Sequence, residues 1–472
     1  MSHGRPEVPS SGSSPAAAPS GSRQPSGSRQ AGGFRLNYRY TVFAMVVLIT
    51  VINYVDRGAI SYAANPMIKE FGLDKAQWGE VLGYFGYGYM VGALFGGALA
   101  DRKGPRWVWT WAVLLWSVFE IGMAFAGNVG VALFGGSALV GFAVFRILFG
   151  VSEGPTFSTI NRTMANWATV RERGFAASLG LLGTPLGALL AAPIAVFLLT
   201  ITGQWRWMFI ILGLLGLVWL IFWRRVFTNL PEDNPKVSPR ELSVIRSTEG
   251  MLADERSLST EDERVPWWSF FKSRTLVFNA IGYFAFQYVN FMILTWTPKY
   301  LQDQFGFNLG SLWYLGMVPW IGACFTVLLG GKISDWLRRR TGSLWIARSA
   351  FAAGSLLLTT VCFCLIPTVH SAGGVLLLMA IGNALNSLPN AVYWIVVIDT
   401  APTRAGTFGG ISHFITNIAT IVAPTLTGYL VALHGYNSMF IATGVATAVG
   451  MVSMMFVRPG VRSRKLKAGV AA

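Results

Sequence analysis

The sequence predicts an all-α membrane protein with twelve transmembrane helices in two six-helix pseudo-repeats. Three observations lead to this fold class: the composition is too apolar for a water-facing surface, twelve apolar runs approach the length of a spanning helix, and basic residues concentrate in alternate loops. Of the 472 residues, 53% are hydrophobic and 12% are charged. A soluble domain usually carries about 25% charged residues, so the expected surroundings are a lipid bilayer.

Each apolar run is close to the roughly 20 residues that cross the hydrocarbon core of a bilayer. A polar, proline-containing stretch at 228–273 divides the runs into two sets of six. The runs lie near 40–65, 77–99, 106–126, 131–158, 174–200 and 205–227, and then near 274–301, 311–331, 344–367, 373–398, 405–433 and 436–458. The expected domains are a disordered cytosolic tail at 1–37, six-helix bundles at 38–227 and 274–458, a cytosolic linker at 228–273, and a tail at 459–472.

The basic residues set the expected orientation. Thirty of the 37 Lys and Arg residues fall in the two tails, the linker and the loops of one side, and four fall on the other side. Cytoplasmic loops of membrane proteins carry the excess of Lys and Arg, so both termini are expected in the cytoplasm. The net charge of +16 then reflects topology, and no nucleic-acid partner is expected. The start of the chain has no apolar segment of a secretory signal.

Catalytic chemistry has little support in the sequence. The three cysteines and four histidines show no paired-ligand spacing, and no nucleophile–base set is apparent. We therefore expect no enzyme activity, no metal and no cofactor.

The two halves echo each other at equivalent places. The second run ends in Gly96-Gly97-Ala-Leu-Ala-Asp101, and the eighth ends in Gly330-Gly331-Lys-Ile-Ser-Asp335, each followed by a basic loop. The string GGALADRKGPR at 96–106 closely resembles the loop signature between spans two and three of the major facilitator superfamily. The resemblance implies the major facilitator fold, with Asp101, Arg102 and Asp335 as residues that control its conformation.

A second set of strings extends along most of the chain. The strings are Asn53-Tyr-Val-Asp56-Arg57, Arg146-Ile-Leu-Phe-Gly-Val-Ser-Glu153, Asn166-Trp167, Arg171-Glu-Arg173-Gly174, Leu230-Pro-Glu232, Glu241-Leu242 and Trp296-Thr-Pro-Lys-Tyr-Leu301. Together they are similar to the anion:cation symporter family of that superfamily, which includes proton-coupled carriers of galactonate, glucarate and hexuronates. The similarity extends from about residue 38 to 458.

Four of these residues place charge within apolar runs: Asp56, Arg57, Arg146 and Glu153. A charge near the bilayer centre costs at least about 2.5–3.5 kcal/mol, so their presence requires a reason. One interpretation is two structural ion pairs that join spans one and four, although buried pairs often stabilise no more than apolar packing does. The other is an anion site beside a proton site.

Helical geometry fits the second interpretation. Arg146 and Glu153 are seven residues apart and share one helix face, whereas Asp56 and Arg57 point about 100° apart. A guanidinium matches a carboxylate with two parallel hydrogen bonds. A desolvated acid favours its protonated form unless an arginine lies close, so an anion that recruits the arginine would let the acid take a proton.

The family resemblance implies a role for each residue. Asp56 and Glu153 match protonatable acids, Arg57 the substrate-binding arginine, and Arg146 an arginine that couples substrate to proton. Tyr89, Trp394 and Asn417 fall where the family places substrate contacts, whereas Ala93 replaces a common glutamine. Among other polar residues of the spans, Gln287 and Asn290 fit either the site or interhelical hydrogen bonds, His413 is a weaker coupling candidate, and Glu120 is interpreted as structural.

The expected function is import of an organic anion, specifically a sugar acid, by symport with H⁺. Two alternatives remain: a carrier of aromatic or short-chain carboxylates in the same family, and a membrane sensor that does not transport. The expected protein is a monomer in the cell membrane, most simply a bacterial inner membrane.

Overall fold

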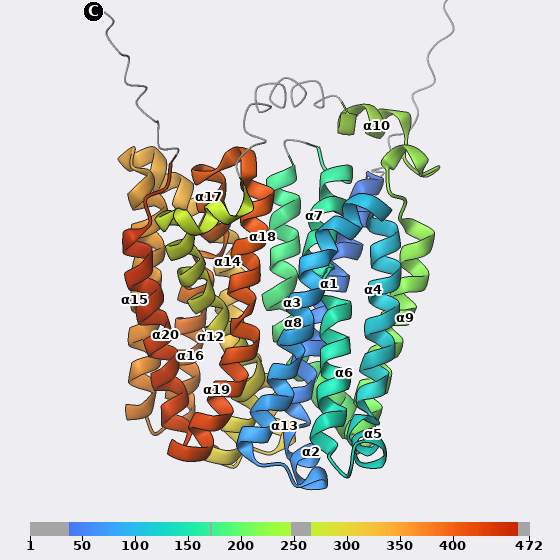
Figure 1. The fold of residues 1–472 in the computed structure, drawn as a ribbon, viewed down its shortest axis with the longest axis vertical. Helices are drawn as coiled ribbons and strands as arrows, with labels where there is room; N and C mark the ends of the chain where they lie inside the picture. The colour runs from blue at the N-terminus through green and yellow to red at the C-terminus, as the bar shows by residue number, and fades with distance from the viewer. Residues whose placement is uncertain (1–36, 170–171, 247–265, 461–472) are drawn as a thin grey trace, which may run out of the picture. The chain divides into compact units, whose positions relative to one another are not determined.

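The computed structural model describes residues 37–169, 172–246 and 266–460. Most of the two predicted tails and the middle of the predicted linker lie outside these ranges. Figure 1 shows that the described chain is helical, and no strand occurs among the described residues.

The described part of the first half contains nine α-helices. They are α1 (Tyr38–Tyr62), α2 (Ala64–Phe71), α3 (Lys75–Lys103), α4 (Pro105–Met123), α5 (Ala126–Leu133), α6 (Ala138–Glu153), α7 (Thr156–Trp167), α8 (Arg173–Thr202) and α9 (Trp205–Val226). The described parts of the linker contain a short turn η1 (Pro231–Asp233), the helix α10 (Pro239–Arg246) and the turn η3 (Trp267–Lys272).

The described second half repeats this scheme. Its helices are α12 (Arg274–Phe305), α13 (Leu309–Leu315), α14 (Val318–Thr341), the π-helical turn η4 (Trp345–Ala350) leading into α15 (Phe351–Leu365), the turn η5 (Ile366–Thr368), α16 (Ala372–Ser387), α17 (Asn390–Thr400), the turn η6 (Pro402–Arg404), α18 (Ala405–Asn417), α19 (Ala419–His434) and α20 (Tyr436–Phe456).

These helices account for the twelve predicted spans. Within the described residues, ten segments are long and apolar enough to cross a membrane, and the pair α4 and α5, bent by 72°, counts as an eleventh. The twelfth is α3, a 29-residue helix that is less apolar and packs between α6 and α19. The chain therefore has the predicted all-α membrane fold of twelve helices in two sets of six.

The boundaries of the fourth span differ from the prediction. The predicted run at 131–158 begins inside α5, and the span itself consists of α6 and α7, from residue 138 to 167. Gly135 and Gly136 have φ angles of 65° and 86°. This left-handed backbone is strained for residues with a side chain, so it places a turn between α5 and α6 where hydropathy alone indicates one continuous run.

Helix α3 has glycines on two faces, and each face meets a different half of the chain. On one face, a Cβ atom added at Gly88 would lie 1.8 Å from the carbonyl oxygen of Ile147 on α6. On the other face, a Cβ added at Gly79 would lie 2.8 Å from both the Cα of Gly428 and the carbonyl oxygen of Pro424 on α19. Small residues allow helices to approach this closely in membranes, so α3 joins the two sets of helices.

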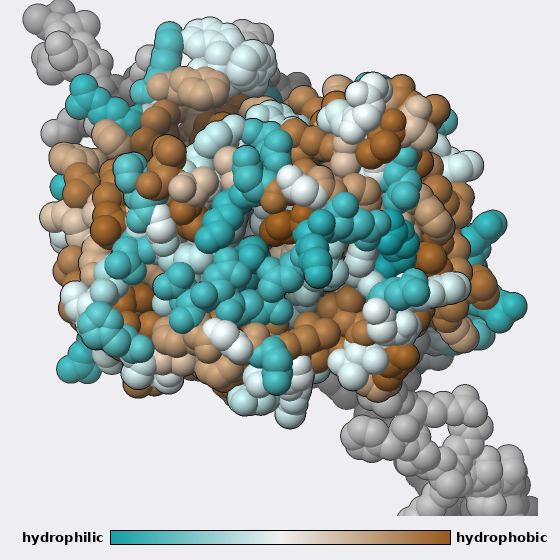
Figure 2. All heavy atoms as spheres, turned by 90° about the horizontal axis from the view of Figure 1, so that it is seen from below, coloured by the Kyte–Doolittle hydropathy of each residue, from teal (hydrophilic) through white to brown (hydrophobic). Residues whose placement is uncertain are grey.

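The end of the helices that carries α2, α5 and α13 is called the distal end, and the end that carries α10 is called the linker end (Figure 1). At the distal end, polar side chains bond across the two sets of helices. Ser61 donates to the carbonyl oxygen of Leu294 (3.0 Å), and Lys299 donates to the side-chain oxygen of Asn65 (2.8 Å). Lys75 lies 3.4 Å from Asp303. Figure 2 shows hydrophilic residues gathered on the face at this end.

Three ion pairs near the linker end instead stay within one set of helices. Arg348 of η4 lies 3.0 Å from Asp335 and 3.1 Å from Asp399, all in the second half. Arg39 of α1 lies 3.0 Å from Glu172, which precedes α8. Burial opposes the charge of Glu172, but hydrogen bonds from Arg39 and Tyr40 prevail and lower its pKa. The polar contacts between the two sets thus favour a conformation closed at the distal end.

The linker helix α10 is attached to the first set of helices. Both carboxylate oxygens of Glu241 accept hydrogen bonds from the backbone N–H groups of Tyr38 and Arg39, each at 2.9 Å. These N–H groups belong to the first turn of α1, where backbone N–H groups have no hydrogen-bond partner within the helix. Glu241 therefore caps α1 although it is 203 residues from Tyr38 and 202 residues from Arg39 in the sequence.

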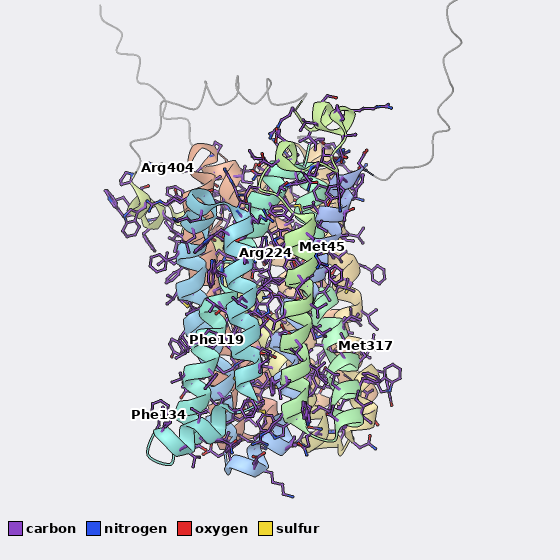
Figure 3. All side chains as sticks on the ribbon, turned by 90° about the vertical axis from the view of Figure 1, so that its right-hand side faces the viewer. Met45, Phe119, Phe134, Arg224, Met317 and Arg404 are labelled. Atoms are coloured by element: carbon purple, nitrogen blue, oxygen red, sulfur yellow. The ribbon has the colours of Figure 1, made fainter. Side chains whose placement is uncertain are left out.

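The outward sides of the helices are apolar along much of their length. Figure 3 shows side chains projecting outward between Arg224, near the linker end, and Phe134, at the distal end. Large exposed apolar side chains on these surfaces include Leu94, Phe197, Phe222, Phe325 and Val445. A surface of this kind suits lipid acyl chains.

Candidate functional site

The centre of the site is an ion pair between α1 and α6. The Nε atom of Arg57 donates to Oε2 of Glu153 at 2.6 Å, and the two side chains are 2% and 0% exposed. Arg57 lies in the C-terminal part of α1, and the adjacent Gly58 packs against Ala191 of α8 and Leu294 of α12. The pair is therefore at the contact between the two sets of helices.

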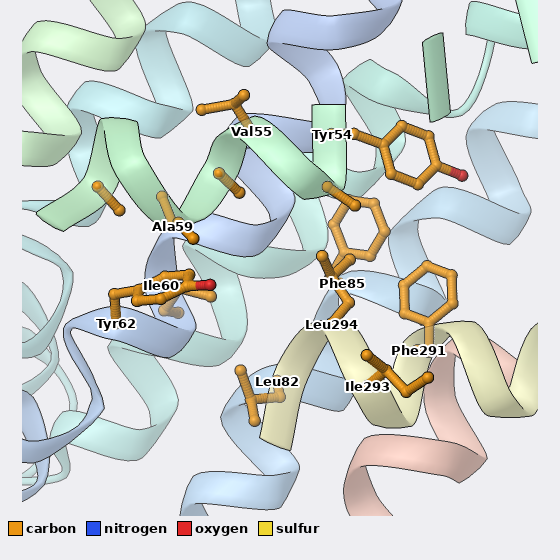
Figure 4. Packing of buried hydrophobic residues seen from close by; sticks show 14 of the residues in the cluster. Tyr54, Val55, Ala59, Ile60, Tyr62, Leu82, Phe85, Phe291, Ile293 and Leu294 are labelled. Carbon is orange, nitrogen blue, oxygen red and sulfur yellow. The ribbon is translucent and has the colours of Figure 1, made fainter. Parts of the chain in front are cut away.

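Three aromatic rings surround the Arg57 guanidinium. Its central carbon lies 4.4 Å from the ring centre of Tyr89, 4.8 Å from that of Tyr54 and 4.9 Å from that of Phe85. Figure 4 shows Tyr54, Phe85 and Leu294 of α12 as members of one cluster of buried hydrophobic residues. Ring faces attract a cation without occupying its hydrogen-bond donors. The Nη2 atom of Arg57 is buried and has no hydrogen-bond partner, so it is free to bind an anion.

Arg146 lies two helical turns before Glu153 on α6. The salt bridge to Glu153 is formed by Arg57 and not by Arg146. Its guanidinium carbon lies 5.2 Å from the ring centre of Phe85, and its Nε atom is buried without a partner. It interacts electrostatically with both Glu120 and Glu153. The shared helix face predicted for Arg146 and Glu153 thus brings them near each other, while Arg57 takes the direct hydrogen bond.

Asp56 is fully buried, and neither of its carboxylate oxygens has a hydrogen-bond partner. Its electrostatic neighbours are Glu120, Glu153 and Arg57. The structural interpretation of two ion pairs predicts a second pair here, but no salt bridge between described residues includes Asp56 or Arg146.

Residues of the second half of the chain lie on the side of the site opposite the Arg57–Glu153 pair. Trp394 of α17 donates through Nε1 to the hydroxyl of Tyr283 at 3.1 Å, and its ring centre lies 5.7 Å from that of His413. Asn417 donates to the carbonyl oxygen of His413 at 2.7 Å. His413 interacts electrostatically with Arg57, and Tyr283 with Tyr54 and Tyr89. The structure thus brings Trp394 and Asn417 to the side of the site that faces Arg57.

The predicted conformational residues lie away from this centre, at the linker end. Asp101 lies 3.6 Å from Arg162, and both side chains are exposed; Arg102 is exposed as well. Asp335 is held by the buried Arg348, which also donates to Ser334 and Asp399. The two equivalent aspartates therefore differ: the contact of Asp335 belongs to a buried network and that of Asp101 does not.

A cavity of about 310 Å³ opens at the distal end, not at Arg57. Its lining includes Tyr62, Glu70, Arg206 and Gln302, which come from both sets of helices. Arg206 donates hydrogen bonds to Glu70 and lowers the pKa of that carboxyl. Because Arg206 is already paired, this cavity lacks an unpaired cation for an anionic ligand.

Sequence reasoning missed several neighbours of the central arginine. Tyr54, Phe85 and Tyr283 contribute rings to the site, yet aromatic residues are frequent in this chain and carry no distinguishing pattern. Glu120, interpreted as structural, is fully buried, and it interacts electrostatically with Arg146. It is the one acid within the apolar run at 106–126, and that isolation is the signal that marks it.

Comparison with known proteins identifies the family. A sequence profile of the Major Facilitator Superfamily matches residues 46–424. The chain is 30% identical over 423 residues to the hexuronate transporter of Bacillus subtilis (strain 168), covering 89% of this chain and 94% of that protein. It is 32% identical over 445 residues to the probable galactarate/D-glucarate transporter GudP of Escherichia coli (strain K12), covering 92% and 96%.

A third relative differs in the size of its substrate. The probable sulfoacetate transporter SauU of Cupriavidus necator is 31% identical over 432 residues, covering 90% of this chain and 95% of that protein. The named substrates of all three relatives are organic anions.

Solved structures share the fold. A bacterial homologue of the human lysosomal transporter Spinster superposes with a TM-score of 0.69 at 16% identity, covering 89% of this chain and 97% of that one. A D-xylose–proton symporter superposes with a TM-score of 0.64 at 20% identity, covering 89% and 98%. The sequence profile confirms the predicted superfamily, and these structures confirm its fold.

Proposed function

The chain belongs to the Major Facilitator Superfamily, and we propose that it imports an organic anion, a sugar acid such as a hexonate, hexarate or hexuronate, together with H⁺. The observation that supports this most directly is the buried Arg57, which pairs with Glu153 through Nε while its Nη2 has no partner. The members of the pair come from two helices, at the point where these helices meet the second half of the chain.

The substrate carboxylate would bind the unpaired side of the Arg57 guanidinium. A planar fork of N–H groups suits a carboxylate better than a point charge does, and the rings of Tyr54, Phe85 and Tyr89 exclude water from it. Trp394 and Asn417 of the second half would contact the polyol part of the substrate. Three relatives named as carriers of sugar acids or sulfoacetate support an anionic substrate.

Proton coupling would follow from competition for Arg57. A bound carboxylate takes over part of the positive charge that stabilises ionised Glu153, so Glu153 becomes easier to protonate. A proton from water then binds a Glu153 oxygen, and the loaded site carries less net charge across the bilayer. Release at the other side reverses both steps. Arg146 and Asp56 lie close enough to influence this exchange.

We further propose that the linker end faces the cytoplasm, with both termini on that side, because thirty basic residues lie in the segments of that side. The contacts that close the distal end would then belong to an inward-facing state. Asp101, Arg102 and Asp335 would control closure at the linker end. The protein would act as a monomer built from six-helix bundles at 38–227 and 274–458, in a bacterial inner membrane.

The alternative within the family is a carrier of smaller or aromatic carboxylates. The sulfoacetate relative, at 31% identity, favours a short two-charge anion as the second candidate. The substitution of Ala93 for a glutamine common in sugar-acid carriers fits either candidate.

Counterflow in proteoliposomes tests these proposals. Vesicles loaded with unlabelled glucarate, a hexuronate, galactonate, sulfoacetate or benzoate are diluted into a trace of the same labelled compound. Transient accumulation with a sugar acid supports the proposed substrate, and accumulation with sulfoacetate or benzoate alone supports the alternative. A membrane sensor would accumulate none of the five compounds.

A further inference from the structure

One contact between aromatic side chains joins the two sets of helices. The ring of Phe157 on α7 lies 6.1 Å from the ring of His413 on α18, centre to centre, with an interplanar angle of 62°. Among the ring-to-ring contacts of the described residues, this is the one that crosses from the first half of the chain to the second. An edge-to-face arrangement of this kind is favourable for aromatic rings, so the two side chains hold each other across the boundary between the halves.

The pair lies between the proposed anion site and the linker end. Phe157 comes four positions after Glu153, and α7 continues from there toward the linker end (Figure 1). His413 comes four positions before Asn417 on α18, the part of its span that lies nearer the linker end. Each ring is therefore about one helical turn closer to the linker end than a residue of the site.

The exposure of the surrounding residues changes at this pair. On its inner side, Glu153 is 0% exposed and Asn417 is 1% exposed. The two rings themselves are half-buried, and about one turn further toward the linker end Asn161 of α7 and Gly410 of α18 are exposed. The molecule is thus open from the linker end as far as the two rings and closed beyond them.

The ring of His413 is supported by other residues of the second half. Trp394 lies 5.7 Å from it, centre to centre, and donates through Nε1 to the hydroxyl of Tyr283 at 3.1 Å. A Cβ atom added at Gly409, four positions before His413, would lie 2.9 Å from the Trp394 ring. Trp394 is therefore packed between α12 and α18, and the position of His413 is set by the helices that also present Trp394 and Asn417 to the site.

We propose that Phe157 and His413 form the inner gate of the transport site, a barrier of two rings that separates Arg57 from the solvent of the linker end. Because polar contacts close the distal end, this barrier completes the enclosure of the guanidinium. Opening the gate requires two side chains to part, whereas opening the distal end requires packed helices to separate. The inference rests on the proposed function only in taking Arg57 as the anion site, and it assigns the imidazole no part in proton transfer.

The accessibility of Arg57 tests the gate. Phenylglyoxal modifies arginine side chains that solvent reaches, and digestion followed by mass spectrometry gives the rate at each arginine. In wild-type protein in lipid nanodiscs, Arg57 should react at least about tenfold more slowly than the exposed Arg339, because a buried group reacts only after a local opening. If Arg57 reacts as fast as Arg339, no barrier protects the site and the proposal is wrong.

Substitutions at the two rings then test the pair itself. Phe157→Ala and His413→Ala should each accelerate modification of Arg57 by about tenfold or more, because the opening no longer requires two rings to part. His413→Phe keeps a ring and should leave Arg57 protected. Protection that survives either alanine substitution would refute a gate of two rings. If His413→Phe exposes Arg57 as much as His413→Ala does, a barrier formed by the ring alone is refuted.

The same digests contain an internal control. Arg348 is 2% exposed, as Arg57 is, but it belongs to the ion-pair network of the second half. Its modification should stay slow in His413→Phe and in both alanine variants, which separates an open gate from a loss of structure.

Two further variants remove rings that pack within one half. Phe119 lies on α4, which packs against helices of the first half, and Phe278 of α12 lies against Phe456 of α20. Phe119→Ala and Phe278→Ala should leave Arg57 protected. If they expose it as much as the gate substitutions do, any lost ring loosens the helices and the assignment is overturned. The measurement needs no substrate, so a failure of sugar-acid counterflow would contradict the proposed function without altering this result.

Discussion

Arg57 and Glu153 are 96 positions apart in the sequence, and the structure joins them through a hydrogen bond of 2.6 Å between Nε and Oε2. The bond uses one edge of the guanidinium and leaves Nη2 unpaired. A residue that is fixed by an acid and still has a free donor is suited to alternate between that acid and an incoming anion. The first two predictions concern this alternation.

Arg57→Lys should weaken substrate binding at least tenfold, equivalent to about 1.4 kcal/mol. The charge is kept, but an ammonium cannot pair with Glu153 and a carboxylate through separate edges of a planar fork. Binding is measured by calorimetry with the sugar acid that shows counterflow. Arg339→Lys, at an exposed position, is the control and should bind normally. Normal binding by both Arg57→Lys and Arg57→Ala would place the anion site elsewhere.

Glu153→Gln should abolish uphill uptake driven by a pH gradient while leaving substrate exchange active. The glutamine oxygen can still accept from Arg57, but the residue cannot take up or release a proton. Exchange requires no net proton transfer, so labelled and unlabelled substrate should still cross. Both are measured in the same proteoliposomes, with and without an imposed gradient.

The same linkage sets the pH dependence of binding. Protonation and substrate binding favour each other, so wild-type affinity should rise as the pH falls, and this rise should be lost in Glu153→Gln. Accumulation against a gradient by Glu153→Gln, with the wild-type pH profile, would show that Glu153 is structural. Asp56→Asn should also reduce uphill uptake, and it should weaken substrate binding through its neighbour Arg57.

Gly79→Val should prevent closure at the distal end. A Cβ at Gly79 meets backbone atoms of Gly428 and Pro424 at 2.8 Å, and backbone cannot move aside as a flexible side chain does. Counterflow should fall at least tenfold, which corresponds to about 1.4 kcal/mol on the transition barrier. Gly97→Ala, whose Cβ would have its nearest neighbour at 3.9 Å, is the matched control. Wild-type counterflow in Gly79→Val would mean that the contact between α3 and α19 does not limit the cycle.

The failure of the distal end to close in Gly79→Val can be detected at Ser61. In the closed distal end this residue is buried and bonded to the carbonyl oxygen of Leu294. A Ser61→Cys substitution should be inaccessible to a thiol reagent in otherwise unchanged protein. It should become reactive when combined with Gly79→Val. Equal reactivity in both would show that Gly79→Val impairs transport in some other way.

Topology is tested with single cysteines in a background from which Cys324, Cys362 and Cys364 have been removed. A cysteine at the exposed Lys236 position of the linker should resist an impermeant reagent applied to intact cells. A cysteine at the exposed Lys69 position, at the distal end, should react readily. The reverse pattern would overturn the proposed orientation.

Much of the fold could be predicted because a span that crosses lipid must be apolar, and because basic loops gather on one side of the membrane. The breaks within spans could not be predicted from the sequence, since they depend on tertiary contacts. Helix α5, for example, is apolar enough to read as part of its neighbours, and only the turn through Gly135 and Gly136 separates it from α6. Helix α3 shows the converse: its glycines lower its hydropathy but serve two close interfaces.

The candidate site was predictable at the level of its members and not of its pairings. Charges in apolar runs are rare enough to indicate Asp56, Arg57, Arg146 and Glu153 directly from the sequence. Their spacing in the sequence does not show which residues of different helices are in contact. Only the structure shows that Arg57 is the partner of Glu153. Glu120 was visible as an isolated acid, but its complete burial depends on how α4 packs against α6 and α9.

The docking of α10 on α1 determines where this polypeptide can be divided into two co-expressed fragments. Ending the first fragment at residue 228 would remove Glu241 and leave the amides of Tyr38 and Arg39 without their carboxylate partner, and loss of a helix cap costs about 0.5–2 kcal/mol. Ending it at residue 250 retains α10 with its own half. The second cut is therefore the one from which two fragments should reassemble into an active carrier.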